Sequence, residues 1–403
     1  MDSAKLLSLI GAMGSRTVAV IGDVVADEFV YGRVARVSRE APVLILEYDS
    51  TEIVPGGGGN AANNVGALGG RANLVGVVGR DEPGRRLSAS LHTRVGQRGL
   101  VRSTTRSTAV KTRILAGGVH SAKQQVVRID RAVGNAIDRD SRAKFERHAL
   151  AASLSADAVL LSDYGSGLIS TALVSKITKA LRQRNRPVPV LIDTRYRLLE
   201  FRDLTACTPN ESEVEQALGV RINDNLSVLE KAGRTVLERT GMKAVLITRG
   251  GRGMALFVPH APTVHIPIFG SDEIADVTGA GDTVMATLAL ALASGATFEG
   301  AARLANYAGG IVVMKRGTAT VSADELRRAV KADAVVSGLS RTKDSYETHP
   351  DCRARSGVDT RHVRARCDCR RQRSLSTGRQ LGALPSRSDE VGLGHRRGRR
   401  FTR

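Results

Sequence analysis

Short apolar runs alternate with helix-type segments through the middle of the chain, and this order constrains the fold more than any other feature. The runs at 158–163 and 188–193 each end in aspartate, and a helical pattern covers about 168–184 between them. Another helix is expected to open after 208–213, followed by an apolar run at 243–248. Repeated strand–helix units form a parallel sheet with helices on both faces. The sequence therefore predicts an α/β fold with a mostly parallel central sheet.

The region before this alternation contains a predicted first strand and a second, smaller sheet. Residues 17–22 have the composition of a buried strand. Asp27 follows near its carboxyl end, where ligands bind in open α/β sheets, and could bond sugar hydroxyls; the alternative is an ordinary loop or capping acid. Two β-rich regions, about 31–50 and 107–130, show no helical stripe. They predict a small sheet that acts as a lid and could pair between two subunits of a homodimer.

The composition of the chain supports a globular enzyme-sized core. Hydrophobic residues make up 42% of the 403 residues, which is enough to build one large domain. No apolar run reaches the roughly 20 residues of a membrane helix, and the start of the chain has no signal-peptide pattern. We therefore expect a cytoplasmic location and no membrane partner. Four cysteines, three of them at 352, 367 and 369, indicate no disulfide framework.

Basic charge is concentrated at the end of the chain. Residues 336–403 contribute about half of the net charge of +20 and show no apolar periodicity, so we expect a domain over 1–335 and a basic, disordered tail over 336–403. The tail could be an RNA-binding or membrane-surface arm. A zinc knuckle could use His349, Cys352, His362, Cys367 and Cys369, although their spacing matches no standard ligand pattern. We favour a solvated extension or a shifted reading frame, and expect no nucleic-acid partner.

Four consecutive glycines precede a predicted helix near the start of the chain. They occupy 56–59 and lead into Asn60 and a small-residue helix. Glycines allow the backbone to approach a ligand closely, and an asparagine amide both donates and accepts hydrogen bonds. We interpret Gly57, Gly58 and Asn60 as a polyol site. A flexible linker is the alternative, but a linker would not run directly into a helix suited to tight packing.

Polar residues at the start of the helix after 208 are candidate nucleotide ligands. Asn210 and Glu213 lie one helical turn apart, a spacing that suits Mg²⁺ waters and phosphate. A capping box, in which each side chain bonds the backbone of the other residue, fits the same spacing equally well. The apolar run at 243–248 ends in a glycine turn at 250–253, which is consistent with a nucleotide edge.

The stretch Asp276-Val-Thr-Gly-Ala-Gly-Asp282 contains the strongest chemical signal. Small residues end a polar segment and lead into an Ala-rich run that continues to about Ala293 and should be a helix. Its first backbone N–H groups are free and carry the positive end of the helix dipole, so Gly279, Ala280 and Gly281 could receive a phosphoryl group. Asp282 would then be a general base for an attacking hydroxyl. The alternative is an acid that only complements the helix dipole.

Together these segments resemble, in order and spacing, the ribokinase (phosphofructokinase-B) family of sugar kinases, over roughly residues 15–332. Within it, the chain is most similar to the D-glycero-β-D-manno-heptose 7-phosphate kinases. The segments shared with that branch are Gly22-Asp23-Val24, Arg36-Val-Ser-Arg-Glu-Ala-Pro42, Pro55-Gly56-Gly57, Val110-Lys-Thr-Arg113, Gln124-Gln125, Arg128-x-Asp130, Asp163-Tyr-Gly165 and Gly317-Thr-x-Thr-Val-Ser322.

The resemblance implies a ribokinase-like three-layer sandwich with a β-sheet lid, and ATP-dependent phosphorylation of a sugar hydroxyl. Asp282 would be the base beside the amides of 279–281, Glu213 would reach Mg²⁺ indirectly, and Asp276 would lie near a monovalent cation such as K⁺. Residues implied at ATP are Asn210, Glu211, Ser212, Glu213, Thr248, Gly250, Gly253 and Asn306. Residues implied at the sugar are Asp27, Gly57, Gly58, Asn60 and Lys111, with Lys111 and the lid arginines as partners for a sugar phosphate.

Several departures leave the sugar open. Gly58-Gly59 stand where the heptose kinases usually have two alanines, Arg39 replaces a proline, and 193–197 differs from their Asp-Pro-Lys-Gly segment. The tail also lacks the His-x-x-His pattern of a nucleotidyltransferase domain. Fructose, ribose, ketodeoxygluconate and nucleosides are alternative substrates. A sugar-binding regulator without activity on the same fold is the alternative from another class.

Overall fold

The structure is a computed structural model that describes residues 2–117, 123–131, 136–184, 186–270 and 276–347. By its internal contacts the chain divides into one unit at Met1–Gly338 and another at Leu339–Arg403. The first unit contains the candidate site and every strand that the structure describes. The cysteines and histidines of the suggested zinc knuckle lie outside the described residues. In the part of the chain that is described, no helix is both long enough and apolar enough to cross a membrane.

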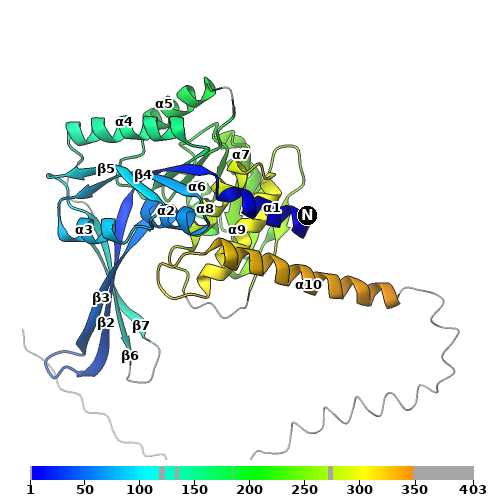
Figure 1. Cartoon of the computed structure of the whole chain (residues 1–403). Helices are drawn as coiled ribbons and strands as arrows, with labels where there is room; N and C mark the ends of the chain where they lie inside the picture. The colour runs from blue at the N-terminus through cyan, green and yellow to red at the C-terminus, as the bar shows by residue number, and fades with distance from the viewer. Residues whose placement is uncertain (1, 118–122, 132–135, 185, 271–275, 348–403) are drawn as a thin grey trace, which may run out of the picture. The chain divides into compact units, whose positions relative to one another are not determined.

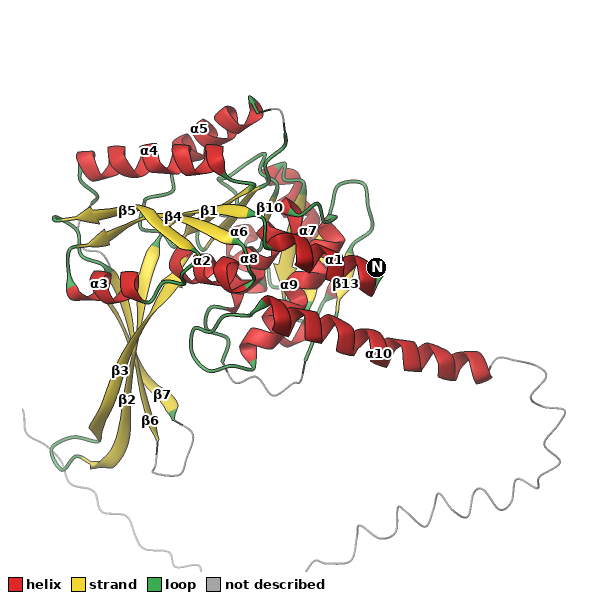
Figure 2. Ribbon diagram, viewed as in Figure 1, coloured by secondary structure: helices red, strands yellow, loops and turns green. Residues whose placement is uncertain are grey.

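A nine-stranded sheet forms the centre of the first unit, in the order β13-β12-β11-β10-β9-β8-β1-β4-β5 (Figure 2). All neighbours from β11 to β5 are parallel, and β12 and β13 are antiparallel additions. The carboxyl ends of the parallel strands therefore share one edge, as a ligand site requires. The strands are β1 (Thr17–Gly22), β4 (Arg71–Gly79), β5 (Val95–Ser103), β8 (Ala158–Asp163), β9 (Val190–Thr194), β10 (Ala206–Cys207), β11 (Ala244–Thr248), β12 (Met254–Phe257) and β13 (Val264–Ile266).

Helices cover both faces of this sheet (Figure 1). Alternate residues of β1 belong to two separate cores, with Val18 and Val20 in one and Ala19 and Ile21 in the other. The first core packs against α1 (Ser3–Met13), α2 (Gly58–Ala67), α3 (Glu82–Ala89), α8 (Ala280–Ala293), α9 (Phe298–Val313) and the start of α10 (Ala323–Glu347). The second packs against α4 (Arg139–Ser155), α5 (Thr171–Arg182), α6 (Glu211–Leu218) and α7 (Leu226–Thr240). The predicted three-layer α/β sandwich is confirmed.

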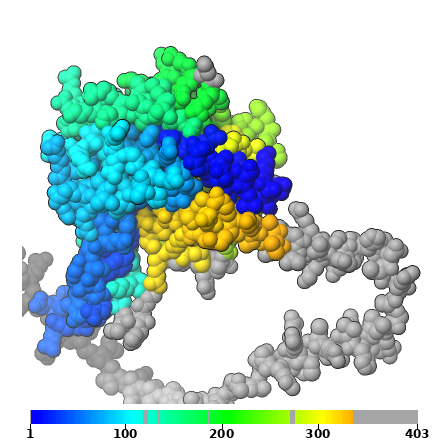
Figure 3. All heavy atoms as spheres, in the orientation of Figure 1, coloured from blue at the N-terminus to red at the C-terminus, as the bar shows by residue number. Residues whose placement is uncertain are grey.

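A four-stranded sheet in the order β3-β2-β6-β7 forms the predicted lid (Figures 1 and 3). Its strands are β2 (Val24–Val37), β3 (Leu44–Gly57), β6 (Ala109–Gly117) and β7 (Gln124–Arg131). β2 is parallel to β6, and the two outer pairs are antiparallel. Every residue of β7 and the last five residues of β2 are exposed. This sheet therefore has little cover on either face at its far end.

Candidate active site

A cavity of about 420 Å³ lies where the carboxyl edge of the main sheet meets the lid. Its walls come from both sheets, from the start of α6 and from the turn that begins α8. Nine of the residues singled out from the sequence line it: Asp27, Gly57, Lys111, Asn210, Glu213, Thr248, Gly279, Gly281 and Asp282. The fold therefore brings together residues from segments more than 250 positions apart in the chain.

Asp282 lies in the first turn of α8 and is only 4% exposed. One carboxylate oxygen accepts a hydrogen bond from Asn60 Nδ2 at 2.9 Å, and the other accepts one from the Tyr164 hydroxyl at 3.1 Å. Asn60 is held in turn by Asn64, whose Nδ2 donates to both the side-chain and backbone oxygens of Asn60 at 3.1 Å. Two donors from separate elements thus fix the carboxylate at the cavity wall.

Burial raises the pKa of Asp282 from 3.8 to about 7. The hydrogen bonds from Asn60 and Tyr164 oppose this increase, the charge of Asp27 adds to it, and the charge of Lys111 opposes it. Water is excluded from the carboxylate, so its ionised form loses more solvation than the two donors restore. A carboxylate with a pKa near 7 is matched to general base chemistry at neutral pH, because it both accepts and releases protons readily.

The turn before Asp282 has the geometry of an anion site. Gly279 adopts a left-handed backbone (φ 76°), and its carbonyl accepts a second bond from Asn60 Nδ2 at 3.2 Å. A Cβ built at Gly281 would meet no atom within 4 Å, so its backbone faces open space. Within the described ranges, the N–H of Gly281 has no acceptor. The N–H of Ala280, by contrast, donates to the Val277 carbonyl at 3.3 Å. The dipole of α8 adds positive potential here.

Three of the predicted sugar residues, Asp27, Gly57 and Lys111, line the cavity on the lid side, whereas Gly58 and Asn60 are buried and do not line it. Asp27 is 5% exposed and forms an ion pair with Arg113 at 2.5 Å, and the Thr318 hydroxyl donates to its other oxygen at 3.2 Å. Gly57 has a positive φ of 56°, and a Cβ there would lie 2.8 Å from the Asp23 carbonyl. Gly58 uses its N–H for that same carbonyl, at 2.8 Å. The glycines thus let the chain pass close to Asp23 while Asp27 keeps a fixed position.

The start of α6 forms the capping box that was the alternative interpretation of this segment. Asn210 Oδ1 accepts from the Glu213 N–H, and Glu213 Oε2 accepts from the Asn210 N–H, both at 2.9 Å. Glu213 nevertheless lines the cavity, and burial raises its pKa. Glu211 is engaged elsewhere, in ion pairs with Arg249 at 2.8 Å and with Arg252. Ser212 is exposed.

Like Glu211 and Ser212, three further predicted nucleotide residues do not line this cavity. Gly250 is exposed, whereas Gly253 is buried and a Cβ there would overlap the Ile266 carbonyl at 2.1 Å. Asn306 is 6% exposed and donates to the Pro267 carbonyl at 2.8 Å. These contacts give Gly253 and Asn306 structural roles next to β13, and a role in binding ATP stays a prediction.

Asp276 organises the loop before α8. Its two carboxylate oxygens accept from the N–H groups of Thr278, at 2.9 Å, and Gly317, at 3.0 Å, and its own N–H donates to the Val313 carbonyl at 3.0 Å. The carboxylate thereby links the chain just before α8 to the chain just after α9. Among the described residues, no group of three or more His, Cys, Asp or Glu is placed to hold a metal ion directly.

The structure places at the cavity three residues to which the sequence analysis gave no individual role. Tyr164 follows β8 and reaches Asp282, and Asp163 and Asp193 also line the cavity. Burial raises the pKa of Asp193 well above 3.8, and the carboxylates of Asp282, Glu213 and Asp163 raise it further. Asp163 is the last residue of β8 and Asp193 the next to last of β9, so their position near two adjacent strand ends was the available signal. Because no three of these described acids are placed to hold a metal ion directly, a divalent cation here would be held through water, and its charge would offset their repulsion.

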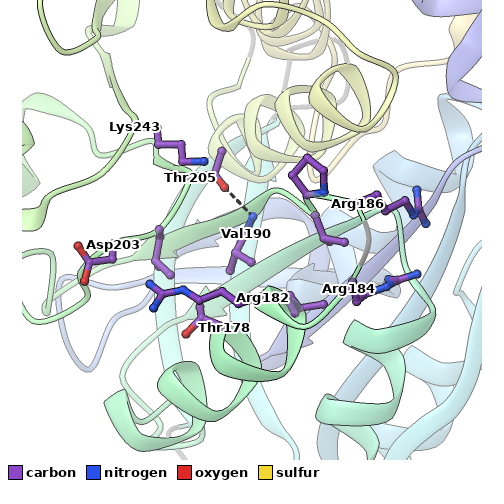
Figure 4. Close-up of a pocket in the computed structure, with 12 residues that line it drawn as sticks. Thr178, Arg182, Arg184, Arg186, Val190, Asp203, Thr205 and Lys243 are labelled. Atoms are coloured by element: carbon purple, nitrogen blue, oxygen red, sulfur yellow. Dashed lines mark hydrogen bonds between the residues drawn. The ribbon is translucent and has the colours of Figure 1, made fainter.

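A separate hollow of about 400 Å³ contains none of the predicted site residues (Figure 4). It lies beside α5, β9 and β10, and Thr205 Oγ1 there accepts from the Val190 N–H at 2.9 Å. Two of its basic side chains already have partners, because Arg186 pairs with Asp157 and Arg184 donates to the Ala156 carbonyl. We therefore assign the chemistry to the cavity that contains Asp282.

Solved structures similar to this chain define the class of fold. The structure of Arabidopsis thaliana ribokinase complexed with ribose and ATP matches with a TM-score of 0.61 at 20% identity, over 79% of this chain and 99% of that one. Phosphofructokinase-2 from Escherichia coli in complex with fructose-6-phosphate matches with a TM-score of 0.61 at 16% identity, over 79% and 98% of the two chains. The fold is therefore ribokinase-like, as the sequence resemblance implied.

Sequence comparison then gives the family. Residues 15–325 match the pfkB family of carbohydrate kinases, and the chain belongs to this family. The Bifunctional protein HldE of Geobacter sulfurreducens is 39% identical over 331 residues, and that of Caulobacter vibrioides is 40% identical over 334. Each alignment covers 81% of this chain and 65% of the relative. The chain thus spans about two thirds of the length of these relatives.

Proposed function

We propose that this carbohydrate kinase transfers the γ-phosphoryl group of ATP to a sugar hydroxyl, with Asp282 as general base. The observation that supports this role most strongly is a buried carboxylate with a pKa of about 7 beside a free backbone N–H in a shared cavity. An acid that only complemented the helix dipole would need neither burial nor two side-chain donors. In the proposed reaction, Asp282 accepts the hydroxyl proton as that oxygen attacks the phosphoryl group.

The other residues of the cavity have distinct proposed tasks. The α8 turn stabilises charge that develops on the transferring phosphoryl oxygens. Asn210, Glu213 and Thr248 face the nucleotide side, where Glu213 would hold Mg²⁺ through water; Mg²⁺ bound to ATP neutralises phosphate charge. We also propose a monovalent cation near Asp276, whose carboxylate joins two loop segments. Equal rates in KCl and in choline chloride would argue against that cation.

For the acceptor, we propose D-glycero-β-D-manno-heptose 7-phosphate, giving the 1,7-bisphosphate. The shared segments quoted above support this branch of the family. The lid side of the cavity supports a phosphorylated acceptor, because Lys111, Arg113 and Arg128 line it together. Charge-assisted bonds from such side chains are well suited to a phosphate group.

A coupled assay of ATP turnover with a panel of acceptors tests the assignment. The panel contains heptose 7-phosphate, unphosphorylated heptose, fructose, fructose phosphates, ribose, ketodeoxygluconate and nucleosides. We expect the highest kcat/KM with heptose 7-phosphate, and a sugar-dependent turnover about 10²- to 10⁴-fold lower in an Asp282→Asn variant. A higher kcat/KM for a neutral sugar would reject the heptose phosphate, and binding of sugars without turnover of any would favour a regulator.

The pH dependence of the reaction provides a prediction from the pKa of Asp282. The carboxylate can accept a proton only when it is ionised, so kcat/KM for the acceptor should rise with pH through about 7 and level off above it. Below that pH, the rate should fall about tenfold for each pH unit. Measuring kcat/KM from pH 5 to 9 at saturating ATP checks this. A flat profile between pH 5 and 8 would contradict a base with this pKa.

We infer that the lid associates with the lid of a second copy of the chain. Apolar side chains are exposed at its far end, including Val37 at 59%, Val43 at 55% and Ile129 at 49%. Both faces of β7 are open there, and the equally apolar lid of a second chain would cover these side chains.

Val37→Glu combined with Ile129→Glu should halve the mass measured by light scattering. The control is Leu226→Glu, which places the same charge on an exposed leucine outside the lid. A wild-type monomer would overturn the inference.

A further inference from the structure

We propose that a second compartment, next to the active-site cavity, binds a phosphate group at the far end of the sugar substrate, with Arg106 as its anchor. The inference rests on the proposed kinase function and specifies its acceptor as a sugar phosphate. The compartment has a volume of about 460 Å³. It shares five lining residues with the active-site cavity, namely Val25, Lys111, Arg128, Tyr164 and Arg195. One substrate can therefore occupy both spaces.

Arg106 is an unusual feature of this compartment because its guanidinium is buried and incompletely paired. The residue is 6% exposed, and Nη1 has no hydrogen-bond partner among the described residues. Nη2 makes only a long bond of 3.3 Å to the Ser166 carbonyl. Leaving a buried charged donor unpaired costs free energy, and such groups are rare in folded proteins. An oxyanion in the compartment would supply the missing acceptor.

The loop that carries Arg106 is fixed before any ligand binds. Two residues further on, Thr108 donates to Asp81 through its N–H at 2.7 Å and its hydroxyl at 2.6 Å. Thr108 Oγ1 also accepts from the Gly79 N–H at 2.9 Å. On the other side, the Arg106 N–H donates to Ser103 Oγ at 3.1 Å. The backbone that carries Arg106 is thus held on both sides of the residue, which lowers the entropic cost of ordering this loop when an anion binds.

The remaining charges leave the compartment positive. Its two acids are satisfied, because Asp23 accepts from the Tyr164 and Ser166 N–H groups and Asp130 pairs with Arg128 at 2.7 Å. Arg131 pairs with Glu28 at 2.6 Å. Three further cations line the compartment, and in the ranges that the structure describes none of them has a carboxylate partner within ion-pair distance. These are Arg106, Lys111 and Arg195. A phosphate dianion matches this charge better than a neutral hydroxyl group does.

The position of Lys111 relates the compartment to the base. Its Nζ lies 4.8 Å from the centre of the Tyr164 ring, and the hydroxyl of that tyrosine bonds Asp282 at 3.1 Å. Lys111 and Tyr164 therefore form the boundary between the two spaces. A sugar whose reacting hydroxyl is at Asp282 would extend past this boundary toward Arg106. The phosphate must accordingly sit at the opposite end of the sugar from the hydroxyl that reacts.

The test compares Arg106→Gln and Arg106→Lys in the full chain, with Arg102→Gln as the matched control. Arg102 lies on β5 and is exposed, so the control removes the same charge near the same loop without touching the compartment. We expect Arg106→Gln to raise KM for the preferred sugar phosphate about 10- to 100-fold, the loss typical of a hydrogen bond to a charged group. KM for ATP should stay within about twofold of wild type. Arg106→Lys should raise KM for the sugar phosphate less than Arg106→Gln does, because a point charge remains.

The outcome separates this inference from the heptose assignment. If wild type uses heptose 7-phosphate and Arg106→Gln leaves its KM unchanged, the compartment is not the phosphate site but the assignment stands. If wild type prefers a different sugar phosphate and Arg106→Gln raises its KM, the compartment stands and the assignment fails. Calorimetric titration of the sugar phosphate without ATP gives a readout independent of turnover, and equal affinities for wild type and a folded Arg106→Gln overturn the inference.

Discussion

Replacing Asp282 with asparagine should lower kcat by about 10²- to 10⁴-fold, the contribution typical of a general base. The amide keeps the size of the carboxylate and can still accept from Asn60 and donate to Tyr164, so the site keeps its shape. It cannot accept a proton from the sugar hydroxyl. Steady-state kinetics with the best acceptor measures the effect, and calorimetry of ATP binding should show an unchanged Kd. Retained turnover would remove Asp282 from the mechanism.

The same substitution should stabilise the fold at high pH. The raised pKa means that the folded state favours the neutral carboxyl, so the stability that this carboxyl contributes is present at low pH and is lost as pH rises through about 7. At pH 8 Asp282→Asn should therefore increase the free energy of unfolding by up to about 4 kcal/mol, and at pH 5 by much less. Urea denaturation at both pH values measures this. Asp140→Asn at the exposed first turn of α4 is the control for loss of a helix acid.

Gly279→Ala should reduce kcat/KM by about 10²- to 10³-fold, comparable to removing an anion-site donor. A Cβ at Gly279 would lie 2.4 Å from Asn60 Nδ2, which donates to both Asp282 and the Gly279 carbonyl. The collision displaces this donor and moves the turn that would hold the phosphoryl group. Because φ is 76°, the alanine also strains the backbone, which should lower the free energy of unfolding by about 1–3 kcal/mol.

Gly295→Ala is the matched control for that strain. Gly295 follows the other end of α8 with φ of 86°, and a Cβ there would meet no atom within 4 Å. Gly295→Ala should lower the free energy of unfolding by a similar amount, because its backbone is strained in the same way, and its kcat/KM should equal that of wild type. Equal loss of activity in both variants, measured at a temperature where both are folded, would show that strain rather than the contact with Asn60 is responsible.

The sequence predicted local elements closely where one pattern dominated. β1 and β8 have the expected bounds, because a continuous apolar run can be satisfied only in a strand buried on both faces. α8 begins at Ala280, as the small residues before Asp282 indicated. The segment at Asn210 was different, since a capping box and a ligand pair require the same spacing. Only the three-dimensional structure distinguishes the two alternatives, and it shows the capping box with Glu213 still facing the cavity.

By itself, the sequence determined that this chain forms a parallel α/β sheet, that a glycine turn precedes Asp282, and that its motifs follow the order of the pfkB family. These features depend on periodicity and on neighbouring residues, which a linear pattern contains. The tertiary structure alone decided that Asn60 and Tyr164 hold Asp282 and that Arg106 is buried with an unpaired nitrogen. Hydrogen bonding and burial between segments 118 and 222 positions apart arise only when the chain packs, and they set the pKa on which the proposed chemistry depends.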